Sequence, residues 1–429
     1  MLKVLYPICA GLDIHKKIVV ATIASTDAQN ITAYQTQSFT TFYKGLLALK
    51  NWLIANNCLH ACMESTGKYW IPVFNVLEDQ IHVQLAHPKF VKAIKGKKTD
   101  KKDSKWIADL FKHDLVPASF IPPKDIREIR DLARYRAKLV NMRTGEKNRY
   151  QNAMTVSNLQ LASVISDPFG VSARNITSYL LSTDGPNADH ITSLLRKQLR
   201  NKSSLVLDSL EGFQIASDQA FKMRTITSHI ESINEMIEKT ELELIKRCLP
   251  YEPYIQLLVQ LPGISRLSAM LILGEIGANM SVFKSAKHFA SWAGCTPTNN
   301  ESAGKKRSVK ISQAGVFLKP ILIQCVLAGL KEKSNLYFKT KYQKIKKRRG
   351  HKKALIAVCR MMLISIYHMF TTGEQFNPCD YEEFTNPNTH QSVVLSNTIV
   401  LHYLQKNGFD TTSIEAQISA QVSPAPVPA

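Results

Sequence analysis

Four acidic residues near the N-terminus constrain this 429-residue chain more than any other feature of its sequence. Asp13 follows a long apolar run, and Glu64 ends a short one. Asp100 and Asp103 lie three residues apart at the start of a predicted helix, so both face the same side of it. Carboxylates that converge repel one another unless a cation lies between them. The four residues therefore predict a site for a hard divalent ion, Mg²⁺ or Mn²⁺, of the kind that drives displacement at phosphorus.

Each of these acids also has an ordinary structural explanation. Asp13 is compatible with a solvated turn between two strands. Asp100 is compatible with a helix cap, and Asp103 with a first-turn acid that the helix dipole favours. Glu64 is harder to explain in this way, because the chain is apolar right up to its carboxylate.

The pattern of apolar residues over 1–124 predicts an α/β domain. Strand-like runs cover most of 10–23, with a tight turn at His15-Lys16-Lys17, and recur over 61–64 and 83–86. Helical spacing covers 42–56, 69–78 and 100–111. A hairpin followed by alternating helices and strands indicates a mixed sheet flanked by helices.

The rest of the chain is predicted to be mostly helical. Residues 125–255 contain a long basic helix over 125–155, an irregular segment over 156–204, and a helical hairpin or coiled-coil arm over 205–249. Residues 256–370 form a second compact unit, in which 261–277 resembles a helix-hairpin-helix element. The apolar stretch 354–370 is predicted to be a buried helix, and the tail 371–429 is predicted to be partly disordered.

The charge of the chain indicates a polyanionic partner. The formal net charge is +21 and the sequence pI is about 9.5, which favours nucleic acid or an anionic membrane. Residues 305–353 contain 16 Lys and Arg against one acid, Glu332, whereas the tail 371–429 has six acids against Lys406. The sequence has no uninterrupted apolar run of about 18 residues, so we expect no membrane-spanning helix and no membrane partner.

The eight cysteines lie mostly inside apolar segments, as small hydrophobic residues do in a reducing compartment. The N-terminus has no secretory pattern. We therefore expect a cytoplasmic protein.

Clusters of cations without compensating acids predict contact with DNA or RNA, although such runs also occur as solvated faces. One cluster surrounds the acids, a second lies along the helix 125–155, and a third lies in the C-terminal unit. The residues that we select from them are Lys97, Lys98, Lys101, Lys102, Arg134, Arg143, Lys305, Lys306, Arg307, Lys346, Lys347, Arg348 and Arg349.

The motifs around these residues resemble one family, the insertion-sequence transposases with a RuvC-like DEDD domain, described as bridge-RNA-guided recombinases. In the first unit the resemblance is carried by Gly11–His15, Met63–Gly67 and Lys98–Asp103. In the second unit it is carried by Leu261–Ile264, Phe289–Gly294 and Asn299–Lys305, so that it covers most of residues 8–370.

This resemblance implies more than the residues alone. It implies an RNase H-like, RuvC-type fold for the first unit and a C-terminal transposase domain for the second. It also implies Asp13, Glu64, Asp100 and Asp103 as catalytic metal ligands, and donor and target DNA as substrates. A structured guide RNA as a partner, and a dimer or tetramer as the working assembly, follow from the resemblance as well.

The resemblance further implies that Ser302 links covalently to DNA. Its small neighbours, Ala303 and Gly304, allow a nucleic-acid backbone to come close, and the cations that follow could bind a phosphate. A serine hydroxyl is a weak nucleophile until a base or metal activates it, and no base lies beside it in sequence. Ser308 and Ser312 are nearby alternatives, and the run Glu301–Gly304 departs from the Ser-Ser-Gly-Gly-like run of many relatives.

Two other functions remain open from the sequence. A metal-dependent junction nuclease needs only the four acids and water. A basic DNA- or RNA-binding protein without catalysis needs only the cations.

Overall fold

A computed structural model describes residues 2–65, 67–91, 99–183, 187–297, 300–302, 305–308, 310–333, 335–378, 380, 405 and 412. The chain divides into two compact units, Met1–Arg127 and Glu128–Ala429. The boundary falls within the long helix α5 (Lys124–Val156), three residues from the predicted boundary at 124. The predicted boundaries at 255 and 370 remain predictions.

The first unit is built on a five-stranded mixed sheet in the order β3-β2-β1-β4-β5. Strand β1 pairs antiparallel with β2 and parallel with β4, while β2–β3 is antiparallel and β4–β5 is parallel. The strands are β1 (Ile8–Ile14), β2 (Ile18–Thr26), β3 (Thr32–Thr40), β4 (His60–Glu64) and β5 (His82–Ala86). The predicted hairpin, its turn at 15–17 and the two later strands are confirmed.

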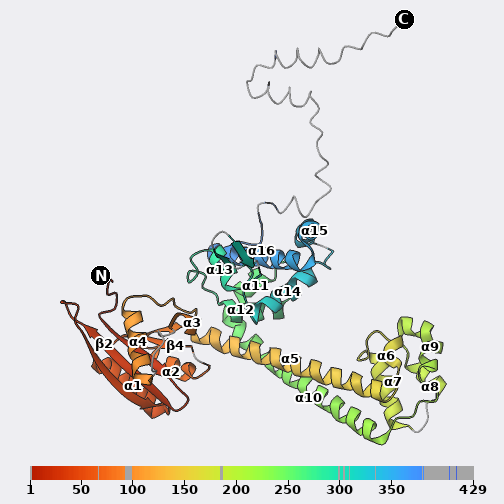
Figure 1. Cartoon of the computed structure of the whole chain (residues 1–429). Coiled ribbons are helices and arrows are strands. Elements are labelled where there is room, and N and C mark those ends of the chain that lie inside the picture. The colour runs from red at the N-terminus through yellow and green to blue at the C-terminus, as the bar shows by residue number, and fades with distance from the viewer. Residues whose placement is uncertain are drawn as a thin grey trace. The chain divides into compact units, whose positions relative to one another are not determined.

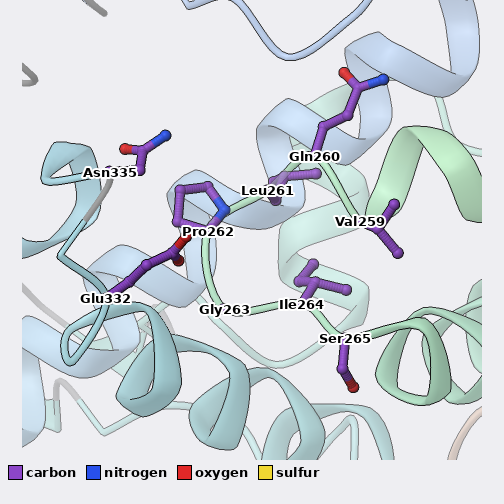
Figure 2. Close-up of a pocket in the computed structure, with 9 residues that line it drawn as sticks. All are labelled: Val259, Gln260, Leu261, Pro262, Gly263, Ile264, Ser265, Glu332 and Asn335. Atoms are coloured by element: carbon purple, nitrogen blue, oxygen red, sulfur yellow. The ribbon is translucent and has the colours of Figure 1, made fainter.

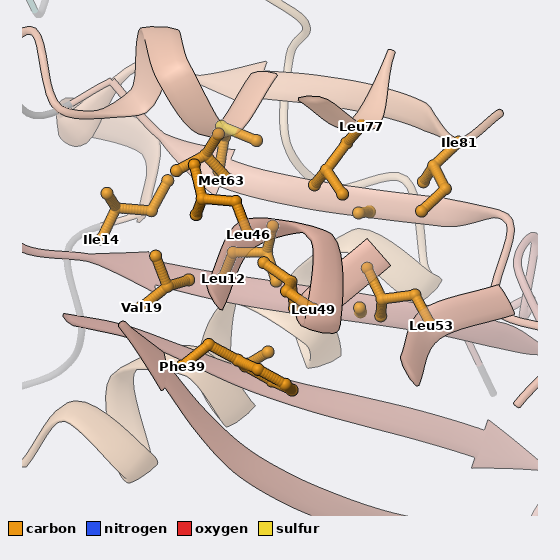
Figure 3. Packing of buried hydrophobic residues seen from close by; sticks show 14 of the residues in the cluster. Leu12, Ile14, Val19, Phe39, Leu46, Leu49, Leu53, Met63, Leu77 and Ile81 are labelled. Carbon is orange, nitrogen blue, oxygen red and sulfur yellow. The ribbon is translucent and has the colours of Figure 1, made fainter. Parts of the chain in front are cut away.

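Helices cover both faces of this sheet. On one face α1 (Tyr43–Ala55) and α2 (Trp70–Leu77) pack on alternate residues of the strands, as Figure 3 shows for Leu12 and Met63 among the leucines of α1. On the other face α4 (Asp100–Lys112) packs on Cys9 and Cys62. Since side chains alternate along a strand, this arrangement turns Gly11, Asp13 and Glu64 toward the face that α4 covers. The short helix α3 (Pro88–Val91) precedes α4 in the chain.

Strand β3 is not predicted from the sequence. Most of its residues are exposed or half-buried, and apolar and polar residues alternate only weakly along it. It is an edge strand held by nine residue pairs with β2, so pairing and not apolar burial accounts for it.

In the second unit, α5 and α10 (Ser217–Cys248) form a long antiparallel pair (Figure 1). Leu139 of α5 packs on Ile233 and Ile237 of α10, and Arg136 forms an ion pair with Glu241 at 2.6 Å. For residues 205–249 the sequence leaves open a helical hairpin or a coiled-coil arm, and the hairpin alternative is wrong. Residues 217–248 form one helix, and its partner is the basic helix α5.

The prediction that 156–204 is irregular is wrong. This segment contains α6 (Leu161–Val164), α7 (Val171–Ser182), α8 (Ala188–Leu194) and a 3₁₀ turn (Lys197–Lys202), followed by α9 (Ser203–Asp208). These helices pack on the end of α5 and the start of α10 around a shared apolar cluster that includes Ile176 and Leu195. Most of them are too short to show a helical period in the sequence, so the pattern of apolar residues does not predict them.

The C-terminal part of this unit is helical apart from a small hairpin of strands β6 (Asn300–Ser302) and β7 (Lys305–Ser308). Its elements are a 3₁₀ turn (Leu249–Tyr251), α11 (Glu252–Leu258), α12 (Arg266–Ile276), α13 (Ala286–Trp292), α14 (Leu318–Gly329), α15 (Tyr337–Arg349) and α16 (His351–Thr372). The predicted mostly α architecture is confirmed.

The turn between α11 and α12 lies where the sequence resembles a helix-hairpin-helix element. It borders a cavity of about 330 Å³, which is lined by 259–265 together with Glu332 and Asn335 (Figure 2). Gly263 has φ +85°, and a Cβ there would lie 2.1 Å from the carbonyl oxygen of Cys325 in α14. The glycine is therefore required by close packing inside the protein. A turn of the helix-hairpin-helix type can bind a phosphate through its backbone N–H groups, and for this chain that role remains a prediction.

Among the described residues, one helix, α16, is long and apolar enough to cross a membrane by length and composition, and half of its apolar window is buried within the fold. Nine of its residues belong to the core, which confirms the predicted buried helix. After α16 the chain contacts the turn between α11 and α12, where the backbone N–H of Phe376 donates to Gln260, and it contacts α15, where Asp380 accepts from Lys341 at 2.6 Å.

Candidate metal centre

The sheet places Asp13 and Glu64 at neighbouring strand ends. Strands β1 and β4 run parallel, and their last register pair joins Leu12 to Met63. Asp13 and Glu64 each follow that pair by one residue, so both lie at the carboxyl ends of adjacent strands. Both residues are half-buried.

Helix α4 brings the other two acids to the same place. Thr99 caps the helix by accepting a hydrogen bond from the backbone N–H of Lys102, so Asp100 is the first helical residue and not the cap. Asp100 and Asp103 both lie in the first turn. Neither acid is therefore needed as the helix cap.

A backbone contact holds α4 against β1. A Cβ at Gly11 would lie 2.1 Å from the Ser104 carbonyl oxygen and 2.4 Å from the Ala108 nitrogen, both of which belong to α4. The hydroxyl of Ser104 also forms a buried hydrogen bond of 2.7 Å with Thr22 on β2. Because Gly11 precedes Asp13 by two residues, this contact places the first turn of α4 over the end of β1.

Two of the four acids, Asp13 and Asp100, converge on His15, which the sequence places only in a turn, whereas Glu64 and Asp103 are not part of this close group. Its Nε2 lies 3.2 Å from Oδ2 of Asp13 and 3.5 Å from Oδ1 of Asp100. One ligand atom from each of these three residues lies within 4.8 Å of the others. A histidine two residues after Asp13 on a tight turn was the available sequence signal, since both side chains lie at the same strand end.

The electrostatics of Asp13 fit a cation site. Burial raises the pKa of its carboxyl above the ordinary value. His15 lowers that pKa, while the charges of Asp100 and Asp103 raise it. The ionised carboxylate is therefore costly in the protein alone, and a divalent cation would remove that cost. The oxygen ligands present suit Mg²⁺ or Mn²⁺.

The Gly11 contact allows a direct test of how α4 is positioned. We expect Gly11→Ala to push α4 away from β1, to lower stability by about 1–3 kcal/mol as overpacking does, and to weaken binding of Mg²⁺. Urea unfolding followed by tryptophan fluorescence reports mainly on the first unit, because three of the four tryptophans, Trp52, Trp70 and Trp106, lie there. Magnesium affinity is measured by calorimetry.

Gly145→Ala is the matched control for this substitution. Gly145 lies inside helix α5, and a Cβ there would meet only the Arg149 side chain at 3.8 Å. Replacing a helical glycine by alanine stabilises by about 0.5–1 kcal/mol. Equal stability and equal magnesium affinity in the Gly11→Ala and Gly145→Ala variants would contradict the positioning role of Gly11.

Lysines accompany the acids at the start of α4. Lys101 and Lys102 are exposed in its first turn. Lys105 lies one turn further along, where its Nζ lies 3.8 Å from the centre of the Tyr34 ring. Lys97 and Lys98, also predicted to contact nucleic acid, lie outside the described residues.

The two arginines selected on the basic helix have partners within the protein. Arg134 forms a two-pronged ion pair with Glu275, a carboxylate that is 5% exposed, with both N–O distances at 2.8 Å. Arg143 donates to Asn234 on α10 at 2.9 Å. Both side chains stabilise the second unit, a role that the sequence did not reveal.

Ser302 lies at the end of the β6–β7 hairpin, in the second unit. It is the last residue of β6 and pairs with Lys305, the first residue of β7. Lys306 and Arg307 continue β7. Positions 303 and 304 between the two strands, and the side chains of 300–309, lie outside the described residues. At this end of the hairpin, Ser302 is therefore paired across the two strands with Lys305, the first of three consecutive cations.

The third basic cluster lies in the last turn of α15. Lys346, Lys347, Arg348 and Arg349 are all exposed there. Cations at a helix C-terminus also complement the helix dipole, which accounts for part of this pattern.

Together these features define a class of protein. A mixed five-stranded sheet, with acids at the ends of its two central parallel strands and on the helix that packs on them, fits an RNase H-like DEDD domain. Sequence comparison gives the family. A transposase model for the DEDD domain of the IS110 group matches residues 10–158. A second model, described as transposase IS116/IS110/IS902 family, matches residues 255–343.

The two matched ranges together cover more than half of the chain and contain all four acids and Ser302. The chain belongs to the IS110 family of transposases, and it is an enzyme that acts on DNA in transposition. A comparison with curated proteins finds no match to this chain.

Proposed function

We propose that this transposase cleaves and exchanges DNA strands at the ends of an insertion sequence with the help of Mg²⁺ or Mn²⁺ held by Asp13, Glu64, Asp100 and Asp103. The observation that carries the proposal is the convergence of Asp13 and Asp100 on His15. The charge of Asp103 also raises the pKa of the Asp13 carboxyl. Glu64 is included because the register of β4 with β1 places it beside Asp13.

The bound metal would stabilise the charge that develops on the phosphate and lower the pKa of an attacking hydroxyl. The protein's part is to hold the ligands in place before DNA arrives. Strand pairing fixes Asp13 and Glu64, whereas the Gly11 contact and the Thr99 cap fix Asp100 and Asp103.

We further propose that Ser302 is the nucleophile. Its Oγ forms a bond to phosphorus while a phosphodiester P–O bond breaks, the serine loses its proton, and the departing deoxyribose oxygen takes one up. Attack by another DNA hydroxyl then reverses these changes and frees the serine. This route conserves the energy of the phosphodiester, and the cations at 305–307 would hold the phosphate.

The partners proposed are donor and target DNA, a structured guide RNA, and further copies of this chain in a dimer or tetramer. The support for the RNA and for the assembly is the resemblance of the motifs to guided recombinases. The exposed cations of α4 and α15, Lys101, Lys102 and Lys346–Arg349, supply surfaces for phosphate backbones. Arg134 and Arg143 are left out because of their partners within the protein.

Removal of the metal tests this function. Purified protein should cleave DNA that carries the ends of the insertion sequence in Mg²⁺ or Mn²⁺, lose cleavage in EDTA, and regain it when the metal is restored. Binding in a gel-shift assay should survive EDTA, because surface cations and not the carboxylates supply it. Cleavage that persists in EDTA would contradict the proposed metal site.

A metal-dependent nuclease is the second candidate, because the acids alone suffice for hydrolysis by water. The products distinguish the two functions. A nuclease leaves free ends, whereas the proposed enzyme joins strands that were separate at the start.

A further inference from the structure

Two neighbouring aromatic residues, Phe42 and Tyr43, are the most exposed large apolar side chains described in the first unit. Their exposed fractions are 79% and 70%. Isolated exposed apolar residues are common on proteins, but two adjacent rings are large, and Ile18 and Leu47 nearby are also exposed. The fold gains little from burial of these rings.

Local structure does not account for the aromatic residues either. Phe42 occupies the N-cap of α1 and provides no side-chain hydrogen bond to the helix. Ser, Thr, Asp or Asn at that position would stabilise the helix, and Phe is a poor substitute. An exposed aromatic ring at a cap position therefore indicates a ligand that is absent from the protein alone.

The backbone places this pair beside the candidate metal centre. The N–H of Thr41 donates to the carbonyl of Lys17 at 3.2 Å, and its hydroxyl donates to the carbonyl of Lys16 at 2.9 Å. Those two lysines directly follow His15, which contacts Asp13 and Asp100. His15 and Lys17 are two residues apart, a span of at most about 7 Å. The rings thus lie at the same edge of the sheet as the acids.

The surroundings of the rings are positively charged. Lys16, Lys17 and Lys44 are exposed, and the segments 14–18 and 40–50 contain no acidic residue. Aromatic rings flanked by cations are the surface that binds single-stranded nucleic acid, because bases stack on the rings and phosphates contact the cations. A lipid surface or a second protein does not require cations between the rings and the metal ligands, whereas a nucleic-acid strand that crosses from the rings to the metal ligands does, because its phosphates need partners.

We propose that Phe42 and Tyr43 form a stacking platform for an unpaired base of the DNA strand that is cleaved, with Lys16, Lys17 and Lys44 on its phosphates. The platform holds the strand so that the scissile phosphate reaches the acids. This inference rests on the proposed function of the metal centre, and it assigns residues that position the substrate without touching the reacting atoms.

The test is binding of a short single-stranded DNA that contains 2-aminopurine, whose fluorescence falls when the base stacks. It is done in EDTA with Asp13→Asn protein, so that cleavage plays no part. The double variant Phe42→Ser with Tyr43→Ala should bind at least roughly tenfold more weakly and lose the fluorescence change, given the usual effect of removing a stacking ring. The conservative pair Phe42→Tyr with Tyr43→Phe should keep both.

Ile31→Ser is the matched surface control. Ile31 is 68% exposed in the turn between β2 and β3, at the other end of those strands, so the variant should bind like the parent. Unchanged affinity in the double variant would overturn the platform. So would a loss confined to an RNA oligomer of the same sequence, or an effect on sedimentation alone, which would indicate a contact between copies of the chain. Because the test measures binding and not cleavage, its result still decides for or against the platform if the metal proposal fails.

Discussion

Asp13→Asn is expected to lower DNA cleavage by at least about a hundredfold while leaving the fold intact. Asparagine has the same shape but lacks the charge that holds a divalent ion. Asp13 lies at the centre of the cluster, since His15 and the charges of both α4 acids act on it. Cleavage is measured with purified protein in Mg²⁺, and metal affinity is measured in parallel by calorimetry.

The effect on stability separates this result from simple unfolding. Because the folded-state pKa of Asp13 is raised, the stability linked to its protonated form is complete below the ordinary carboxyl pKa and is lost as the pH rises through the raised value. Asparagine does not ionise and avoids this loss at neutral pH. The unfolding midpoint in metal-free buffer should therefore not fall.

Asp79→Asn serves as the control for a lost carboxylate. Asp79 forms an exposed ion pair with Lys50 and lies before β5, at the end of that strand opposite to the acids. Exposed pairs of this kind contribute little to stability. The control should cleave normally, and full cleavage by Asp13→Asn would refute the metal role of that residue.

Ser302→Ala is expected to abolish both strand cleavage and strand exchange while metal and DNA binding remain. The substitution removes only the hydroxyl that would carry the phosphate, so no other proposed step is affected. In the parent protein, reactions stopped by denaturant should contain DNA attached to a peptide that includes Ser302. Mass spectrometry of that peptide identifies the attached residue.

Ser308→Ala is the natural comparison for Ser302→Ala. Ser308 lies in β7 opposite Asn300, at the other end of the same small hairpin. It should cleave and exchange strands normally. Normal exchange by Ser302→Ala together with the absence of any protein–DNA adduct would exclude the serine mechanism, and hydrolysis or direct transfer by the acids would replace it.

Much of the first unit could be predicted because its signals are local. Apolar runs that end in Asp13 and Glu64 indicate strands, and Asp100 and Asp103 followed by helically spaced apolar residues indicate a helix start. Strand β3 could not be predicted in this way, since its stability comes from pairing with β2 and few of its residues are buried. The α6–α9 region was missed for a similar reason, because those short helices depend on packing with α5 and α10.

The candidate site was predictable in its residue types but not in its assembly. The i, i+3 spacing placed Asp100 and Asp103 on one helix face, yet nothing in it brought that face to β1. Gly11 is an unremarkable strand residue in sequence, and its function emerges only from the close approach of Ser104 and Ala108. Arg134 likewise resembled a free cation until Glu275, more than a hundred residues later, proved to be its partner.

The contact between Gly11 and α4 has a consequence for the timing of activity. Two of the four proposed ligands belong to a helix that follows β1 by about ninety residues, and that helix packs on Gly11 of β1 through Ser104 and Ala108. Because chains emerge from the ribosome N-terminus first, a growing chain that ends before α4 holds only half of the carboxylates. A truncated chain that ends before α4 would therefore lack two of the four proposed metal ligands, and it could not cut DNA by the proposed route.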